Sequence, residues 1–436
     1  MSERPDMRDA GEAFLGLLRT PRFSSVLATT GVGIAALSYP LVRLTGWAGY
    51  LAALSLLTAL MCLVLALRRR ELDGYEVPPV SMLVFIGWAT ISIAWSDYQW
   101  GTLGGIAYLV TYAVVGIFIA YTRDTIQIVR TWGDVLRVVL GASLAIELLS
   151  GILIDAPIPF LNVQGKLAEL GPISGVLQTR NQLGLLGLIG AITFATELRT
   201  RSVRRLTGVL SLIGAGLCIV LTQSAIIIGT AGVVAVAAAV LYGVRRVRSE
   251  RRQTWQFAIL GGAVAVIVAG WLLRGPLVAV FNAQGALDYR LRLWQKIAAL
   301  LPGSTIEGWG WIGRWHPDVF PFSALTTSGD RPASSALNAY LDVLFQLGII
   351  GLVVFVGMLG LAFIRSWLLA GRRRSVIYAW PALVLVALLL VALAESSILA
   401  EFGWLTFVVC CVKASQELSW RSALRATGPR GTDPSA

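Results

Sequence analysis

Arginines and neutral polar residues near the ends of long apolar segments are the side chains that could carry chemistry in this sequence. A helix over residues 286–301 would carry one apolar stripe, formed by Leu287, Leu291, Trp294 and Ala298. Arg290 borders that stripe and Arg292 faces away from it, so Arg290 is the cation expected to be buried. A buried guanidinium needs an anionic partner. That partner is an acidic side chain, a lipid headgroup, or a pyrophosphate, which a guanidinium holds through two hydrogen bonds. The acidic residues in or beside apolar spans are Glu147, Glu395 and Glu401.

A second group of polar residues recurs at helical spacing inside an apolar segment. Asn338, Asp342 and Gln346 follow one another at intervals of four and would face one side of the span 337–363. A carboxylate inside a membrane span is a functional candidate by default, which applies to Asp342. The alternative is that these three side chains hold helices together through hydrogen bonds.

Two further places complete the set of candidates. Arg180 and Asn181 stand at the mouth of the apolar span 181–197, where an arginine either reaches the membrane interface or binds phosphate beside a second arginine. His316 is the single histidine of the chain and lies in an aromatic segment, which makes it a candidate base. Trp294 and its aromatic neighbours suit either anchoring at the interface or stacking on sugar rings.

These residues belong to a chain that is too apolar for a soluble domain. Of its 436 residues 56% are hydrophobic and 14% are charged, whereas soluble domains carry about 25% charged residues. The apolar runs long enough to cross a bilayer lie near 23–41, 47–67, 79–95, 101–121, 135–154, 181–197, 206–221, 224–242, 256–273, 337–363, 379–394 and 397–412. The sequence predicts an all-α, polytopic membrane helical bundle of about 12 transmembrane helices, without an inverted pair of broken helices of the kind many transporters use.

The distribution of basic residues predicts the orientation of the bundle. With a cytoplasmic N-terminus, 27 of the 36 arginines and lysines fall in inner segments, which is the bias that marks the cytoplasmic side. The net charge of +12 therefore reflects topology and contact with membrane lipids, and no nucleic acid is predicted as a partner. The expected organisation is a cytoplasmic N-terminus (1–22), a transmembrane bundle (23–412) that includes an extracytoplasmic loop (274–335), and a disordered cytoplasmic tail (413–436). The first span is expected to be a retained anchor in the cytoplasmic membrane.

The order of several short motifs between Trp95 and Trp404 resembles the O-antigen ligase and polysaccharide polymerase family of bacterial membrane proteins. An early outer turn reads IAWSDYQW, and it is followed by GVLQTRNQLG and by a turn that contains a serine, LTQSAIIIG. Further along, Arg290 precedes Trp294 by four residues, a Gly-Trp-Gly turn reads GWGWIG, and a helix start reads LNAYLDVLFQLGIIGL. The resemblance rests on the order and spacing of these motifs.

The resemblance implies a glycosyltransferase on the outer face of the inner membrane that acts in surface polysaccharide biosynthesis. Its donor would be a glycan linked to a polyprenyl diphosphate such as undecaprenyl diphosphate, and its acceptor would be another glycan, with no metal, nucleotide or other cofactor. Arg290 and Arg180 would hold the diphosphate, and Asn181, Asn338 and Trp294 would bind diphosphate or glycan. A base would take the proton from the acceptor hydroxyl.

Two positions depart from the pattern of this family. Many ligases have a histidine directly before the asparagine of the last motif, where this chain has Leu337, and many members have an arginine after the serine of the tight turn, where it has Ala225. These departures favour a polymerase over a ligase, with Asp342 or His316 as the substitute base. The alternatives are a transporter or flippase of lipid-linked sugars, and a membrane scaffold without catalytic activity.

Overall fold

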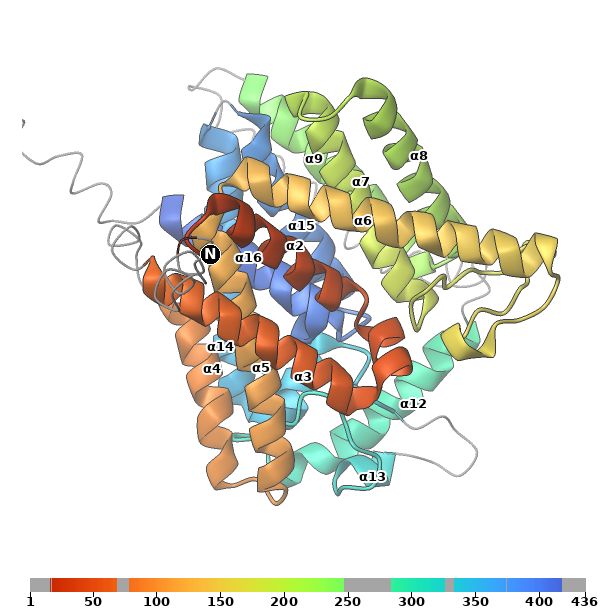
Figure 1. Ribbon diagram of the computed structural model, residues 1–436. Helices are drawn as coiled ribbons and strands as arrows, with labels where there is room; N and C mark the ends of the chain where they lie inside the picture. Colours follow the sequence, from red (N-terminus) through yellow and green to blue (C-terminus); the bar gives the residue numbers. More distant parts are fainter. Residues whose placement is uncertain are drawn as a thin grey trace, which may run out of the picture.

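The computed structural model describes residues 16, 18–68, 78–246, 284–325, 333–373 and 375–417, and the regular structure in these ranges is helical (Figure 1). The longer helices are α2 (Pro21–Ala36), α3 (Ser38–Leu67), α4 (Val80–Ile91), α5 (Gln99–Thr122), α6 (Thr125–Leu148), α7 (Arg180–Thr200), α8 (Arg205–Leu221), α9 (Ala225–Arg246), α12 (Gln284–Leu300), α14 (Ala339–Arg372), α15 (Ala379–Val391) and α16 (Glu401–Glu417). Shorter elements include the helix α13 (Phe322–Leu325) and the 3₁₀ turn η7 (Ser397–Leu399). The predicted all-α class is confirmed.

Six of the described helices are long and apolar enough to cross a membrane: α3, α5, α6 with its continuation to Leu153, α7, α9 and α14. Three shorter apolar helices span Val80–Ala94, Arg205–Leu221 and Val376–Val391. These helices make the chain a membrane protein, but the predicted count of about 12 is not confirmed. The predicted span 256–273 lies outside the described residues.

The predicted span 23–41 is wrong in its boundaries, because the chain forms two helices there. One helix ends at Ala36 and the next begins at Ser38, after Leu37 has left helical geometry with φ −103° and ψ 22°. Pro40 explains the break, since a proline ring has no N–H with which to continue the helical hydrogen bonds. The two helices α2 and α3 lie side by side, and α2 also contacts α6 (Figure 1).

α6 begins at Thr125, ten residues before the predicted span. Asp124 accepts a hydrogen bond from the backbone N–H of Gln127 at 2.8 Å, and the Gln127 side chain accepts one from the backbone N–H of Asp124 at 3.3 Å. This reciprocal capping is a helix start that a sequence can show, because it needs an acidic residue and a glutamine three positions apart. One of the polar residues that obscured it has a partner in the described structure: Nη2 of Arg130 donates to the carbonyl of Ser202 at 3.2 Å.

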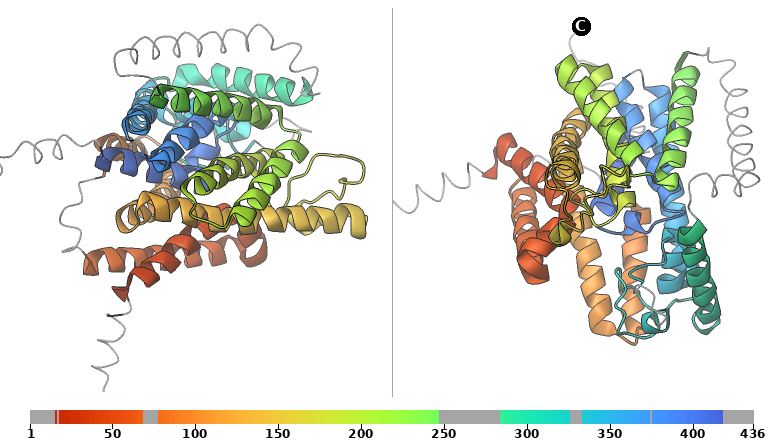
Figure 2. Two further views of the ribbon diagram at one scale, coloured as in Figure 1. Left: turned by 90° about the horizontal axis from the view of Figure 1, so that it is seen from above. Right: turned by 90° about the vertical axis from the view of Figure 1, so that its right-hand side faces the viewer.

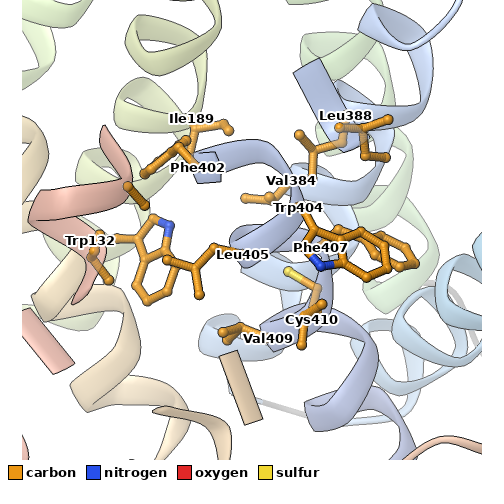
Figure 3. Packing of buried hydrophobic residues seen from close by; sticks show 14 of the residues in the cluster. Trp132, Ile189, Val384, Leu388, Phe402, Trp404, Leu405, Phe407, Val409 and Cys410 are labelled. Atoms are coloured by element: carbon orange, nitrogen blue, oxygen red, sulfur yellow. The ribbon is translucent and has the colours of Figure 1, made fainter. Parts of the chain in front are cut away.

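α16 lies at the centre of the bundle, in contact with α2, α5, α14 and α15. Figure 3 shows Trp404 and Phe407 of this helix in a buried cluster, with Trp132 of α6 on its other side. The indole N–H of Trp132 donates to Thr406 Oγ1 at 3.1 Å, and that of Trp404 donates to the carbonyl of Leu109 at 3.0 Å. A buried N–H without a partner costs about 1–3 kcal/mol, so these bonds fix the rotation of α16 against α5 and α6.

α14 is interrupted at Gly348, where φ is +67° and ψ is −170°. The backbone groups that the helix does not pair are paired by the segment after α12. The carbonyl of Gln346 accepts from Gly310 N at 2.8 Å, and Ile349 N donates to the carbonyl of Thr305 at 2.9 Å. We call the described residues between α12 and α14 (301–325 and 333–338) the outer segment, for their place at one end of the bundle. This segment is therefore held by the backbone of a membrane helix, in the way that non-helical backbone at membrane depth requires.

α3 is interrupted as well, at Gly46, with φ +71° and ψ 172°. Both interruptions stand at glycines, which adopt a positive φ without a steric clash. Neither break was predicted from the sequence.

A second, smaller core forms at the end of the molecule that carries α12 and α13 (Figure 2, right). Its buried residues are Leu293, Ile297, Ile312, Trp315, Phe322, Leu325, Ala333, Ala336 and Phe345. Phe345 belongs to α14, so this core rests directly on the helix that Gly348 interrupts. The arrangement places α12 rigidly at one end of the bundle.

Replacing Gly348 by alanine should destabilise the protein. The new Cβ would overlap the carbonyl oxygen of Ile306, and an L-residue with a positive φ costs about 1–3 kcal/mol. Thermal unfolding of the purified protein in detergent should occur at a lower temperature for Gly348→Ala. Gly357→Ala is the matched control on the same helix, because nothing lies within 4 Å of its Cβ. An equal melting temperature for both variants would contradict the role assigned to the break.

Candidate functional site

Four polar side chains from four segments meet at the start of α7. Nη2 of Arg290 forms an ion pair with Oε1 of Glu395 at 2.8 Å and also donates to the carbonyl of Ala394 at 3.2 Å. Nδ2 of Asn181 donates to the same Glu395 oxygen, and Oδ1 of Asn181 accepts from the Ser224 hydroxyl at 2.8 Å. We call Arg290, Glu395, Asn181 and Ser224 the Arg290 cluster.

The Arg290 cluster is largely buried and has hydrogen-bonding capacity left over. The side chains of Arg290 and Glu395 are 12% and 18% exposed. Nε of Arg290 is buried and has no hydrogen-bond partner among the described residues. A guanidinium has five N–H donors, and the described partners use only Nη2. The arginine can therefore accept a further anionic partner without first losing all of its present bonds.

The structure corrects the apolar stripe predicted for α12. Leu291 is 44% exposed, whereas Leu293 and Ile297 are buried. Arg290 precedes these two residues by three and seven positions, so it lies on the buried face itself rather than at its border. Arg292 is exposed, as the sequence predicted.

A second arginine, which sequence reasoning missed, lies beside the start of α7. Nη2 of Arg314 donates to Oε1 of Gln178 at 3.2 Å, and the guanidinium lies over the Trp47 ring, 5.8 Å from its centroid. Arg314 also attracts Glu401 electrostatically, and Glu401 accepts a hydrogen bond from the Tyr108 hydroxyl at 2.9 Å. The available signal was an arginine directly after the GWGWIG turn.

The first turn of α7 connects the two arginines, because Gln178 and Asn181 are three residues apart. Thr179 caps the helix by accepting a hydrogen bond from Gln182 N at 3.2 Å. The other N–H groups of a first turn point outward, and with the helix dipole they favour anions at this end. Arg180 is exposed there, and its side chain has no hydrogen bond or ion pair with a described residue. Its role in binding phosphate stays a prediction.

Trp294 and Asn338 support the site from a distance. The indole N–H of Trp294 donates to the carbonyl of Ala336 at 2.8 Å, which ties α12 to the start of α14. Oδ1 of Asn338 accepts from the backbone N–H groups of Tyr340 and Leu341 at 3.0 and 3.1 Å, so Asn338 is the N-cap of α14. Among the described contacts, no hydrogen bond joins either side chain to the Arg290 cluster.

Asp342 holds the outer segment on α14. Its side chain is buried, and Oδ1 accepts from the indole N–H of Trp315 at 2.9 Å and from Nε2 of Gln346 at 2.7 Å. Oδ2 accepts from Ala336 N at 3.2 Å. Gln346 continues the network, because its Oε1 accepts from Ile312 N at 2.8 Å. The printed bonds of Asp342 and Gln346 thus lie within α14 or reach the loop segments beside it, and Asn338 caps its own helix.

Two further residues concern the predicted catalytic base: His316 is a candidate for it, and Leu337 stands where many ligases have a histidine. His316 is exposed, and no described hydrogen bond connects its ring to the Arg290 cluster. Leu337 packs against the second core, and two residues later Ala339 N donates to the carbonyl of Ala392 at 2.8 Å. The start of α14 therefore lies against the segment that carries Glu395.

Removing the Asp342 carboxylate should weaken the fold of the outer segment. Asp342→Ala leaves the indole N–H of Trp315 and the backbone N–H of Ala336 without an acceptor. Each buried donor without a partner lowers the free energy of unfolding by about 1–3 kcal/mol. We expect a clear drop in melting temperature and faster proteolysis between α12 and α14. Asp318→Asn, at an exposed position of the same segment, is the control and should melt like the wild type. An Asp342→Ala protein that is fully stable but inactive would instead favour a catalytic Asp342.

Residues 209–356 match the model of a protein family described as O-antigen ligase. The matched range contains Ser224 and Arg290 of the Arg290 cluster, along with the first half of α14. No curated protein matches the chain. The family match agrees with the motif order seen in the sequence and with the membrane helices of the structure. It supports the assignment of this chain to the O-antigen ligase and polysaccharide polymerase family of membrane proteins.

Proposed function

We propose that this protein is a membrane glycosyltransferase that polymerises or ligates polyprenyl-diphosphate-linked glycan on the outer face of the cytoplasmic membrane. The observation that carries the proposal is Arg290, a buried guanidinium with unused N–H donors at the positive end of α7. A diphosphate offers the oxygens that such a guanidinium holds through paired hydrogen bonds. The family match supplies the reaction class, a transfer of lipid-linked glycan.

The proposed reaction replaces one bond at the anomeric carbon of the donor. A hydroxyl oxygen of the acceptor glycan attacks that carbon, and the bond from the carbon to the phosphate oxygen breaks. Its electron pair leaves with the polyprenyl diphosphate, while the hydroxyl proton passes to a base. Negative charge grows on the leaving group, and fixed donors aimed at it lower the barrier. Arg290, Arg314 and the first turn of α7 are placed to supply this stabilisation, with exposed Arg180 beside them.

The residues at positions 337 and 225 favour a polymerase over a ligase. Leu337 occupies the place of the histidine found in many ligases, and its side chain packs in the second core, so it cannot accept a proton. Ala225 begins α9 directly after Ser224, where many family members have an arginine. In this chain Ser224 serves to hold Asn181 in the Arg290 cluster.

The breaks in α3 and α14 are the observation that favours a transporter of lipid-linked sugars. Discontinuous helices in transporters leave backbone groups open to the substrate. At Gly348, however, Gly310 and Thr305 already occupy the freed groups of Gln346 and Ile349. This break therefore anchors a loop, and the glycosyltransferase remains the better supported function.

Arg290→Ala should abolish glycan transfer and leave the protein folded. In a strain that lacks this gene, complementation with the variant should yield short surface glycan and accumulated lipid-linked repeat units, measured by gel electrophoresis and mass spectrometry. Loss of one donor to a developing anion costs about 10²–10³-fold in rate. Arg292→Ala is the matched control, exposed two residues away on α12, and should restore full-length glycan. Wild-type glycan from the Arg290→Ala strain would contradict the proposed function.

The proposed orientation makes opposite ends of α7 accessible from opposite sides of the membrane. Asp318 lies in the exposed segment near the site, and Arg204 lies in the arginine-rich turn between α7 and α8. In a background without native cysteines, Asp318→Cys should react in intact cells with a maleimide that cannot cross the membrane. Arg204→Cys should react only after permeabilisation. The reverse pattern would place the site in the cytoplasm, where this transfer is not proposed.

A further inference from the structure

We propose that Glu395 is the catalytic base of the transfer and takes the proton of the acceptor hydroxyl as its oxygen bonds to the anomeric carbon. The inference rests on the proposed function and adds a residue to it. It follows from the way the two oxygens of this carboxylate are used and from its position beside Arg290.

One oxygen of Glu395 is fixed, and the other is available. Oε1 accepts hydrogen bonds from both Arg290 Nη2 and Asn181 Nδ2, and Ser224 in turn holds Asn181. No described residue donates to Oε2, and the side chain keeps 18% of its surface exposed. A carboxylate held through one oxygen presents the other in a defined direction, which is the geometry that proton transfer from a bound hydroxyl requires.

The other candidate bases of the described chain are placed differently. Both oxygens of Asp342 accept hydrogen bonds from within the fold, and its side chain is 1% exposed. His316 is exposed and has no described hydrogen bond to the Arg290 cluster. Glu401 accepts from Tyr108 on the side of Arg314. Glu395 is the carboxylate that directly contacts the arginine proposed to hold the leaving group.

The segment that carries Glu395 is fixed on both sides. It lies between the end of α15 at Val391 and the turn η7. The carbonyl of Ala392 accepts from Ala339 N at 2.8 Å, and the carbonyl of Ala394 accepts from Arg290 at 3.2 Å. The carboxylate is therefore positioned by α14 and α12 as well as by its own side-chain bonds.

The surroundings also adjust the acidity of this carboxyl group. Burial raises the pKa of Glu395 above its ordinary value, although Arg290 and Asn181 each act to lower it. The groups that face it in the described structure are the charged Arg290 from α12 and the neutral Asn181 from α7. A base works best when its pKa lies near the working pH, so a raised carboxyl pKa suits this role.

The direct test compares transfer rates of Glu395→Gln and wild-type protein in proteoliposomes. The donor is the lipid-linked glycan that accumulates in the deletion strain. Glutamine keeps an oxygen for Arg290 and Asn181 but takes up no proton, so transfer should fall roughly 100-fold or more. Binding of undecaprenyl diphosphate, measured by thermal shift, should stay equal or become tighter, because a negative charge beside Arg290 is gone. Glu307→Gln, an exposed acid in the outer segment, is the control and should transfer like wild type.

The pH dependence of the wild-type rate tests the same inference, with Glu395→Gln for comparison. Glu395 accepts a proton only when it is deprotonated, so the wild-type rate should fall as pH drops through its raised pKa. That decline should be absent from the residual activity of Glu395→Gln. A wild-type rate that stays level down to pH 4.3, about the ordinary glutamate pKa, would overturn the assignment.

The outcomes separate this inference from the function on which it rests. If wild-type protein transfers no glycan and the deletion leaves surface glycan unchanged, the proposed function fails. If wild type transfers, Arg290→Ala does not, and folded Glu395→Gln retains most of the rate, only the base assignment is wrong. If Glu395→Gln loses transfer and diphosphate binding together, Glu395 positions Arg290 and is not the base.

Discussion

Backbone groups inside a membrane must find partners within the protein, and the break of α14 at Gly348 is where this requirement shapes the molecule. The outer segment folds by pairing those groups, as the bond from Gly310 to Gln346 shows. Asp342 then adds side-chain bonds to the same segment. Because the second core rests on this part of α14, α12 is held in one place, and Arg290 faces the start of α7.

The charged groups obey a related constraint, since a buried charge without a partner is costly. Arg290 is matched by Glu395, and Arg314 attracts Glu401. Both carboxylates belong to the short connection between α15 and α16, including the first residue of α16. Arg290 and Arg314 therefore each have an acidic residue as a partner.

Local patterns predicted the features that depend on local geometry. Hydropathy identified the helical membrane class, and helical spacing separated buried Arg290 from exposed Arg292. The same spacing placed Asp342 and Gln346 on one face, where the structure joins them at 2.7 Å. The capping residues Asp124 and Gln127 also form a local pattern. Hydropathy nevertheless placed the start of this span at 135, because the first turns of α6 contain polar residues.

Features that depend on helix packing could not be predicted in this way. The partner of Arg290 lies 105 positions away, and Arg314 reaches Gln178 across 136 positions. Several acidic residues were equally possible partners until the helices were placed. The break at Gly348 was hidden for another reason, because glycines are common in membrane helices and few of them take a positive φ.

The hydrogen bonds between the outer segment and the backbone of α14 have a consequence for chimeras of related proteins. Loops are usually treated as replaceable units whose ends are set by the helices they connect. Here the loop and the first half of α14 share one set of hydrogen bonds, from Thr305 to Ile349. A chimera that takes the loop from one protein and the helix from another would combine halves of two different networks. A chimera should therefore take the loop together with the helix up to the residues just past Gly348.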